Sequence, residues 1–430
     1  MPSLGWRCLC GAGNLATIYC PFCGWTAPTW VPPVPVAAEP PRFAFDRRSR
    51  WLAAAIAVLL FAGLNTVSVR VRAAEHAREA AFQATVHELE AFVAERRGGP
   101  FVRNVDATLM DDDDFVAAMY GDTGEPDDPY AEVEEPAPGD FAATMVGLGM
   151  ADADDDRDTE ETLLEEGVYG FYDRDSKRLY VRATVLNAFA KMVLVHELTH
   201  AWQDQHFDLT LMYDDVDSAD EDRALRALVE GDASRIEREW RLSRPDEERA
   251  EIDSFERGLF GDPSEPSRAT RTLNLLYGFL YRDGASFVGA LAQRGGNAAV
   301  DRAFADPPVT TEQVIHRAAY LRHEAPVPVT ATTGGSESQT VDEDDLGEVG
   351  LALVVGQGDV TEAALRAVTG WGGDAYVTWI DDGQTCTSLA VAMDTVAARD
   401  RLLAALGAQH VADRTLRAEG ERGLLMTTCV

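Results

Sequence analysis

The chain has 430 residues, of which 46% are hydrophobic, so it can bury one large core or two ordinary ones and wholesale disorder is excluded. Acidic residues number 73 against 38 arginines and lysines, which gives a formal net charge of −35. Because such a surface repels a polyanion, nucleic acid is not expected as a partner. Lysine occurs only at Lys177 and Lys191, and an acidic surface with so little lysine is typical of proteins adapted to molar salt.

Two close pairs of cysteines stand near the N-terminus, Cys8-Leu9-Cys10 and Cys20-Pro21-Phe22-Cys23. Four thiolates in two pairs suit the tetrahedral preference of Zn²⁺, so residues 1–27 are predicted to form a zinc ribbon with one structural zinc ion held by Cys8, Cys10, Cys20 and Cys23. The first pair is one residue closer than the usual C-x2-C. A redox-active or disulfide-linked segment is therefore the alternative. Residues 28–50, rich in proline and arginine, form a stiff linker.

The longest uncharged apolar stretch runs from Trp51 to Val69. At about 1.5 Å per helical residue it matches a hydrocarbon core of about 30 Å, so it predicts a transmembrane helix, with a buried core helix as the alternative. Arginines are slightly more numerous before this stretch than after it, which favours a cytoplasmic N-terminus. We therefore expect a single-pass cell-membrane protein whose larger, C-terminal part is extracytoplasmic.

Residues 170–181 read as a hairpin, and the segment from Ala183 to Gln205 reads as a strongly apolar helix without glycine or proline. This helix contains His196-Glu197-Leu198-Thr199-His200. Positions four apart share one helix face, so both imidazoles can bind one cation, and the H-E-x-x-H pattern predicts zinc. Glu197 is the predicted catalytic residue: it takes a proton from the zinc-activated water and later delivers it to the leaving amine.

The third ligand has two candidates. A helix over residues 222–240 carries Glu230 within Leu228-Val229-Glu230-Gly231-Asp232-Ala233. A glutamate on a second helix, some thirty residues downstream, resembles the gluzincin arrangement of thermolysin-like peptidases and the E-G-x-A segment of zinc aminopeptidases, which implies Glu230 as a ligand. The rival is His206, whose spacing resembles that of the metzincins, although Gln203 stands where that family needs glycine. Glu237, on the same face as Glu230, is the fallback ligand.

A peptidase of this kind also needs a donor for the oxyanion of the tetrahedral intermediate. His316, at the end of the segment Thr310 to His316, is the favoured catalytic candidate, with Tyr281 and Tyr172 as alternatives. The structural interpretation of His316 is a histidine that caps or packs at a helix end.

The C-terminal part reads as strand, strand, helix and strand over residues 375–380, 387–393, 396–405 and 423–429. Cys386 and Cys429 stand beside or within these strands. A disulfide between them and two free buried thiols are both compatible with the sequence.

Several segments together are similar to a group of poorly characterised, halophile-type gluzincin-like metallopeptidases: Gly170 to Tyr180, His196 to Phe207, Ala227 to Ala233, Tyr281 to Val288 and Pro307 to Tyr320. The resemblance spans roughly residues 141–430. It implies an α+β fold with a mainly helical peptidase body and a small edge hairpin, to which we add a C-terminal α/β subdomain, the ribbon and one transmembrane helix. The predicted domains are 1–27 ribbon, 28–50 linker, 51–69 transmembrane helix, 70–140 helical stalk and acidic linker, 141–330 peptidase body, 331–346 acidic linker and 347–430 C-terminal subdomain.

The expected function is that of a membrane-anchored zinc peptidase that hydrolyses a peptide or protein substrate. The alternative is a sensor or scaffold that keeps the fold without catalysis and uses the ribbon to bind a partner.

Overall fold

The computed structural model describes residues 47–120, 140–155, 159–259, 266–334, 339–381, 384–409, 411 and 413–430, without the side chains of residues 47–69, 71, 140 and 141. It divides into two compact units, Met1–His76 and Ala77–Val430. Helix α1 (Arg47–Arg97) begins in the first unit and ends in the second. The predicted ribbon, with Cys8, Cys10, Cys20 and Cys23, lies outside the described residues.

The predicted membrane-spanning segment requires a correction. Residues 51–69 belong to α1, which continues without a break to Arg97 and carries charged residues from Arg70 onward. Within the described part of the chain, no helix is both long and apolar enough to cross a bilayer. The side chains of residues 51–69 themselves lie outside that part.

The predicted fold class was therefore wrong in its transmembrane helix, and the placement in the cell membrane, with a cytoplasmic N-terminus and an extracytoplasmic peptidase domain, was wrong with it. The apolar run does not form a helix of its own: it is part of a longer helix that continues into a charged stretch. The rest of the fold is α+β, with helices and two sheets.

The smaller sheet has the strand order β1-β3-β2, and β2 and β3 form the predicted hairpin. Strand β1 pairs with β3 in parallel, so a segment far upstream completes the sheet, in which β3 is central and β1 and β2 are the edge strands. Phe115 of the adjacent α2 packs edge-on against Phe171 of β2. The elements are β1 (Asp106–Met110), α2 (Asp112–Met119), α4 (Thr159–Gly167), β2 (Gly170–Asp173) and β3 (Arg178–Arg182).

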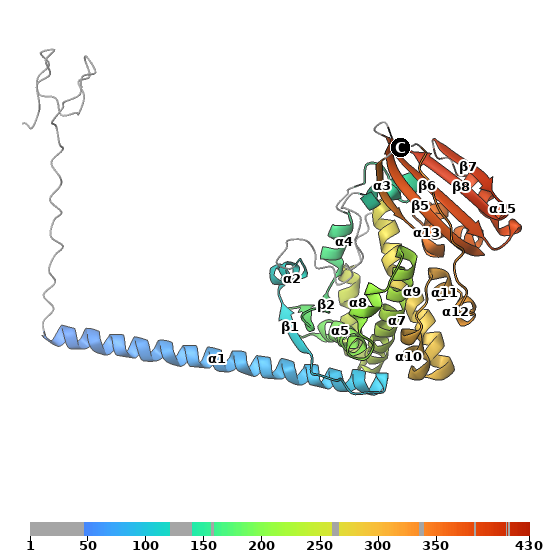
Figure 1. Ribbon diagram of the computed structural model, residues 1–430. Helices are drawn as coiled ribbons and strands as arrows, with labels where there is room; N and C mark the ends of the chain where they lie inside the picture. Colours follow the sequence, from blue (N-terminus) through green and yellow to red (C-terminus); the bar gives the residue numbers. More distant parts are fainter. Residues whose placement is uncertain are drawn as a thin grey trace, which may run out of the picture. The chain divides into compact units, whose positions relative to one another are not determined.

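Helix α5 lies between this sheet and α7, and the three share one apolar core (Figure 1). Leu179 of β3, Leu198 of α5 and Trp240 of α7 are all buried in it. The helices predicted over residues 183–205 and 222–240 are thus confirmed as α5 and α7, with shifted ends. The helical layer consists of α5 (Ala188–Phe207), α6 (Leu209–Asp214), α7 (Ala219–Ser243), α8 (Asp246–Leu259), α9 (Arg268–Gly295), α10 (Asn297–Ala305), α11 (Thr311–Ile315) and α12 (Arg317–Leu321).

Helices α7 and α9 touch backbone to backbone at Gly231 and Gly284. A Cβ at Gly231 would overlap the carbonyl of Gly284, and a Cβ at Gly284 would overlap the carbonyl oxygen of Ala227. Neither neighbour is a side chain that could move aside. The glycine next to Glu230 is therefore required by helix packing, and it fixes α7 at the level of this glutamate.

Gly284→Ala is expected to lower the free energy of unfolding by about 3 kcal/mol, the upper end of overpacking penalties, because the two helices must separate. Gly289→Ala is the matched control on the same helix, since a Cβ there meets no atom within 4 Å. It should raise stability by up to about 1 kcal/mol through helix propensity. Urea unfolding followed by circular dichroism measures both. Equal stabilities would contradict the close approach.

The C-terminal sheet has the strand order β4-β5-β6-β8-β7 and confirms the predicted strands and helix in this region. Strands β4 and β7 were not predicted, and β4 lies within the expected linker 331–346. Cys386 and Cys429 face each other on β6 and β8 and form a disulfide. The elements are α3 (Asp140–Leu148), β4 (Gln339–Asp344), α13 (Gly347–Gly356), α14 (Glu362–Val368), β5 (Trp371–Asp381), β6 (Gln384–Met393), α15 (Val396–Gly407), β7 (Arg414–Glu419) and β8 (Gly423–Cys429).

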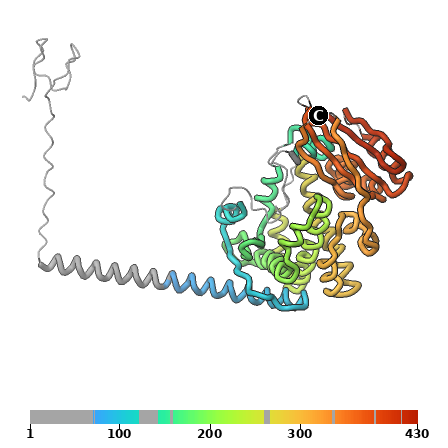
Figure 2. The backbone as a smooth tube through the Cα atoms, in the orientation of Figure 1, coloured from blue at the N-terminus to red at the C-terminus, as the bar shows by residue number. Residues whose placement is uncertain are grey.

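Helix α9 joins the two halves of the second unit (Figure 2). Its N-terminal residues Ala269 and Leu273 belong to the core beneath the C-terminal sheet, whereas Phe279 and Phe287 belong to the core shared with α7. Helix α7 and the C-terminal sheet are therefore packed on one common helix.

Candidate metal centre

Helix α5 supplies two histidines to one buried point. It begins at Asn187, whose side chain accepts a hydrogen bond from the backbone N–H of Ala190, and it runs unbroken past both histidines. The His196 and His200 rings lie 4.8 Å apart between centroids, each with 9% of the residue exposed. The four-residue spacing thus places both imidazoles on the same buried face of the helix, as expected.

Glu230 of α7 lies opposite this pair. Its Oε2 is 3.0 Å from Nε2 of His196 and its Oε1 is 3.4 Å from Nε2 of His200. Ligands about 2.0–2.1 Å from a tetrahedral zinc ion would be roughly 3.4 Å apart, which is close to these two distances. The ligand atoms of all three residues lie within 4.8 Å of one another. Among the described residues, His196, His200 and Glu230 are the one group of three or more His, Cys, Asp or Glu side chains close enough together to hold a metal ion.

The other ring nitrogen of each histidine has its own acceptor. Nδ1 of His196 is 3.0 Å from Oε2 of Glu237, and Nδ1 of His200 is 2.9 Å from Oε1 of Gln203. Both partners can accept a hydrogen bond from Nδ1, and Nε2 of each ring is the atom that faces Glu230 and would bind a metal. Glu237, the fallback ligand in the sequence analysis, therefore orients His196 from the side opposite Glu230.

The two Nε2 atoms and the Glu230 carboxylate would repel one another through their lone pairs, so a cation is needed between them. Although burial alone would lower the pKa of His196, its contacts with Glu230 and Glu237 raise that pKa well above its ordinary value. Burial opposes the charge of Glu230 too, yet the two imidazoles hold its pKa below the usual range. The cation is a proton when no metal is present, and a zinc ion would replace it with release of protons.

Gln203 also connects the two ligand helices. Its Nε2 donates to the backbone carbonyl of Val229 at 3.0 Å and to Asp232 at 3.1 Å. Asp232 in turn pairs with the buried Arg97 of α1 at 3.0 Å. The position of His200 is thus fixed by a buried chain of polar contacts through α5, α7 and α1.

Glu237→Ala is expected to weaken zinc binding about tenfold to hundredfold, the usual cost of removing a carboxylate that orients a histidine ligand. Glu239→Ala is the matched control, because Glu239 is on the same helix but pairs with Arg96 and Arg235 instead. Competition with a chromophoric chelator measures both affinities. Identical zinc affinities in the two variants would contradict the assigned role.

Glu197 lies beside the metal ligands and lines a cleft, where burial raises the pKa of its carboxyl group. Strand β2 passes directly over it, because a Cβ on Gly170 would meet Val193 at 2.5 Å and Glu197 at 3.0 Å. Only a glycine permits this approach. The hairpin is therefore held against the helix at the level of the proposed catalytic carboxylate.

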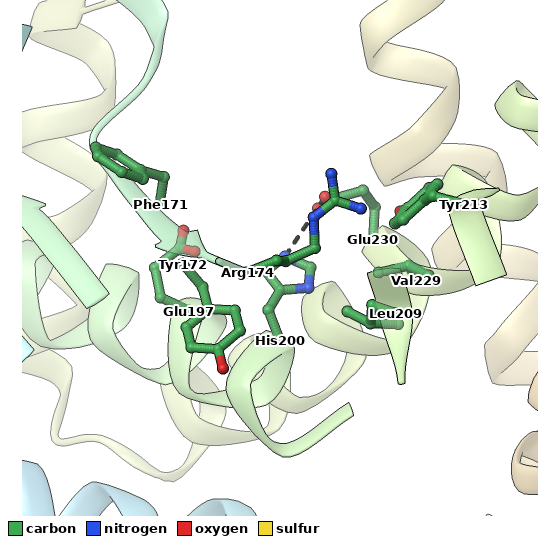
Figure 3. Close-up of a pocket in the computed structure, with 9 residues that line it drawn as sticks. All are labelled: Phe171, Tyr172, Arg174, Glu197, His200, Leu209, Tyr213, Val229 and Glu230. Atoms are coloured by element: carbon green, nitrogen blue, oxygen red, sulfur yellow. Dashed lines mark ion pairs between the residues drawn. The ribbon is translucent and has the colours of Figure 1, made fainter. Parts of the chain in front are cut away.

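The cleft has about 360 Å³ of empty space and is open to solvent on one side. Figure 3 shows its walls: β2 and the following turn on one side, α6 and α7 on the other, with His200 and Glu230 joined at its base. The lining residues are Phe171, Tyr172, Arg174, Glu197, His200, Leu209, Tyr213, Val229 and Glu230.

His206 does not join the other histidines. Helix α5 continues to Phe207, and the exposed His206 ring stacks on Trp202 with 3.8 Å between centroids. Gln203, at the position where a metzincin has glycine, keeps the chain helical, so the third histidine is not turned towards the metal. The geometry favours Glu230 over His206 as the third ligand.

His316 does not line the cleft. It follows α11, and its Nε2 lies 3.0 Å from Glu348 of α13, which raises the pKa of the imidazole. Tyr172 does line the cleft, but its hydroxyl donates to Asp204 at 2.9 Å. The Tyr281 ring lies 5.9 Å from that of His196. The structural interpretation of His316, a helix-end residue with a packing partner, agrees with this placement.

Two cleft residues were not predicted as functional, Arg174 and Tyr213. Tyr213 comes from α6, whose first residue follows Asp208, a residue with a left-handed backbone (φ 58°) that ends α5 and turns the chain back. Burial raises the pKa of Tyr213, so its hydroxyl stays protonated at neutral pH.

Comparison with models of protein families, with curated proteins and with solved structures gives no match for this chain.

Proposed function

We propose that the chain is a zinc-dependent peptidase of the gluzincin type. The observation that carries this proposal is the convergence of His196, His200 and Glu230 beside a cleft, which is lined by His200, Glu230 and Glu197. Three protein ligands leave one coordination position open, which is typical of catalytic zinc and unlike closed structural sites. Zinc held there supplies Lewis acidity for the attack of water on a peptide carbonyl.

Two cleft residues, Glu197 and Tyr213, have roles in the proposed reaction. Glu197 accepts a proton from the attacking water and passes it to the leaving amine, and its buried position suits a carboxylate that must hold a proton transiently. The protonated hydroxyl of Tyr213 is the proposed donor to the developing oxyanion, in place of His316.

The substrate is proposed to bind as an extended strand along β2. This strand is at one edge of the sheet as described, and its residues Phe171 and Tyr172 line the cleft. A peptide added to β2 would therefore lie directly above Glu197 and the metal ligands.

The proposal is tested by incubating the zinc-loaded full chain with a mixed peptide library at high and low salt, with mass spectrometry of the products. We expect peptide cleavage that a chelator abolishes and added zinc restores. We also expect two zinc ions per chain, one of them in the predicted cysteine ribbon. Stoichiometric zinc without any cleavage would instead support the sensor or scaffold alternative.

A further inference from the structure

One corner of the cleft carries cationic groups, although the chain as a whole has a charge of −35. Arg174, the residue after β2, places its guanidinium carbon 4.5 Å from the centre of the Tyr213 ring. Arg226 of α7 places its own at 5.2 Å from the same ring. Tyr213 therefore has two guanidinium groups within cation–π distance.

The two arginines are placed differently. Arg226 is buried and pairs with Asp222 one helical turn earlier, at 2.5 Å, so it acts as a support behind Tyr213. Arg174 lines the cleft itself, together with Glu197 and Glu230 (Figure 3). Stacking engages the face of a guanidinium, whereas its N–H groups lie in the plane of the group.

We propose that Arg174, held in place by Tyr213, binds a carboxylate of the peptide substrate close to the bond that is cleaved. The carboxylate belongs either to an aspartate or glutamate side chain or to the free C-terminus of the substrate. This inference rests on the proposed peptidase function and adds its substrate class.

Three physical reasons favour a carboxylate. A planar guanidinium binds it through two parallel hydrogen bonds, a geometry that ammonium groups do not provide. The remaining titratable residues of the cleft are Glu197, His200, Glu230 and the two tyrosines, so Arg174 is the arginine among the residues that line it. A partly enclosed ion pair is also screened less by salt than a surface pair, which keeps it effective for an acidic protein at high salt.

The test begins with the peptide that the wild-type chain cleaves best in a mixed library. This peptide is resynthesised with Glu, Gln or Lys at each position next to the cleaved bond, and with a free or an amidated C-terminus. We expect kcat/KM to be about tenfold or more higher for Glu than for Gln, or for the free acid than for the amide. The first result identifies a side-chain carboxylate as the ligand, and the second identifies the chain end.

In Arg174→Met this ratio should fall to about one, and in Arg174→Glu the Lys peptide should become preferred to the Glu peptide. Arg178→Met is the matched control: Arg178 is on the same hairpin but pairs with Asp106 and does not line the cleft. Its ratio should equal that of the wild type. Arg174→Lys, which keeps the charge without the planar geometry, covers the case in which Arg174→Met does not fold.

A wild-type chain that cleaves peptides with no preference for a carboxylate would overturn the inference and leave the peptidase proposal standing. The same holds if the preference survives in Arg174→Met. If the wild type cleaves nothing, the peptidase proposal fails, and calorimetry with N-acetylglutamate against N-acetylglutamine still tests the site. Equal affinity for the two compounds would then overturn the inference by itself.

Discussion

Glu197→Gln is expected to keep its zinc and to lower kcat/KM for peptide hydrolysis by about 10²- to 10⁴-fold. Glutamine has nearly the same shape as glutamate but cannot accept a proton from water, so it removes the general base alone. Glu197 is not one of the three residues that converge on the metal position, and the substitution should therefore not empty the site. Steady-state kinetics and zinc analysis by mass spectrometry measure the two effects separately.

Glu239→Gln is a suitable control for this substitution. Glu239 is partly exposed on α7, and its contacts are with Arg96 and Arg235, away from the cleft. The Glu239→Gln variant should hydrolyse peptides at the rate of the wild type. Peptide hydrolysis by zinc-loaded Glu197→Gln at the wild-type rate would refute the proposed mechanism, whatever the structure of the metal centre.

Glu230→Ala is expected to lose the zinc ion of the cleft, whereas His206→Ala is expected to keep it. Glu230→Ala removes both carboxylate oxygens that face the histidines, at 3.0 and 3.4 Å, and leaves two candidate ligands. The loss of affinity should exceed the tenfold to hundredfold that follows from removing an outer partner such as Glu237. In the full chain, zinc should fall by one ion in Glu230→Ala, since the predicted cysteine ribbon is untouched.

His206→Ala separates the two models of the metal site. The ring of His206 stacks on Trp202, so its removal should cost packing energy of about 1 kcal/mol and no zinc. Circular dichroism of both variants shows whether a lost metal reflects a lost fold. A chain that loses zinc with His206→Ala and keeps it with Glu230→Ala would have the metzincin-like ligand set after all.

The two histidines of the candidate metal site could be predicted because their signal is local. His196 and His200 are one helical turn apart, and an apolar run without glycine or proline already requires that turn. The prediction of Glu230 as the third ligand needed a further argument, which was the resemblance of its glutamate-glycine segment to the gluzincin pattern. The structure adds the physical reason for the neighbouring Gly231, which is the backbone contact between α7 and α9.

The residues around the metal could not be predicted in the same way. The contact of Glu237 with His196 depends on how α5 and α7 are rotated against each other, so the sequence does not indicate it. Gln203 reaches His200 within one turn of α5, a spacing that is local but carries no motif. His316 was favoured as the oxyanion donor for its residue type, yet its imidazole faces Glu348. Tyr213 lies in the cleft only because Asp208 turns the chain between α5 and α6.

The sequence by itself determined the hairpin, the H-E-x-x-H helix, the second ligand helix and most strands of the C-terminal sheet, since each depends on residues within a few positions of one another. Only the tertiary structure decided which strands complete the sheets, that the apolar run at 51–69 belongs to a longer helix, and which tyrosines line the cleft. Those features depend on contacts between segments far apart in the chain, and such contacts are set by packing as a whole.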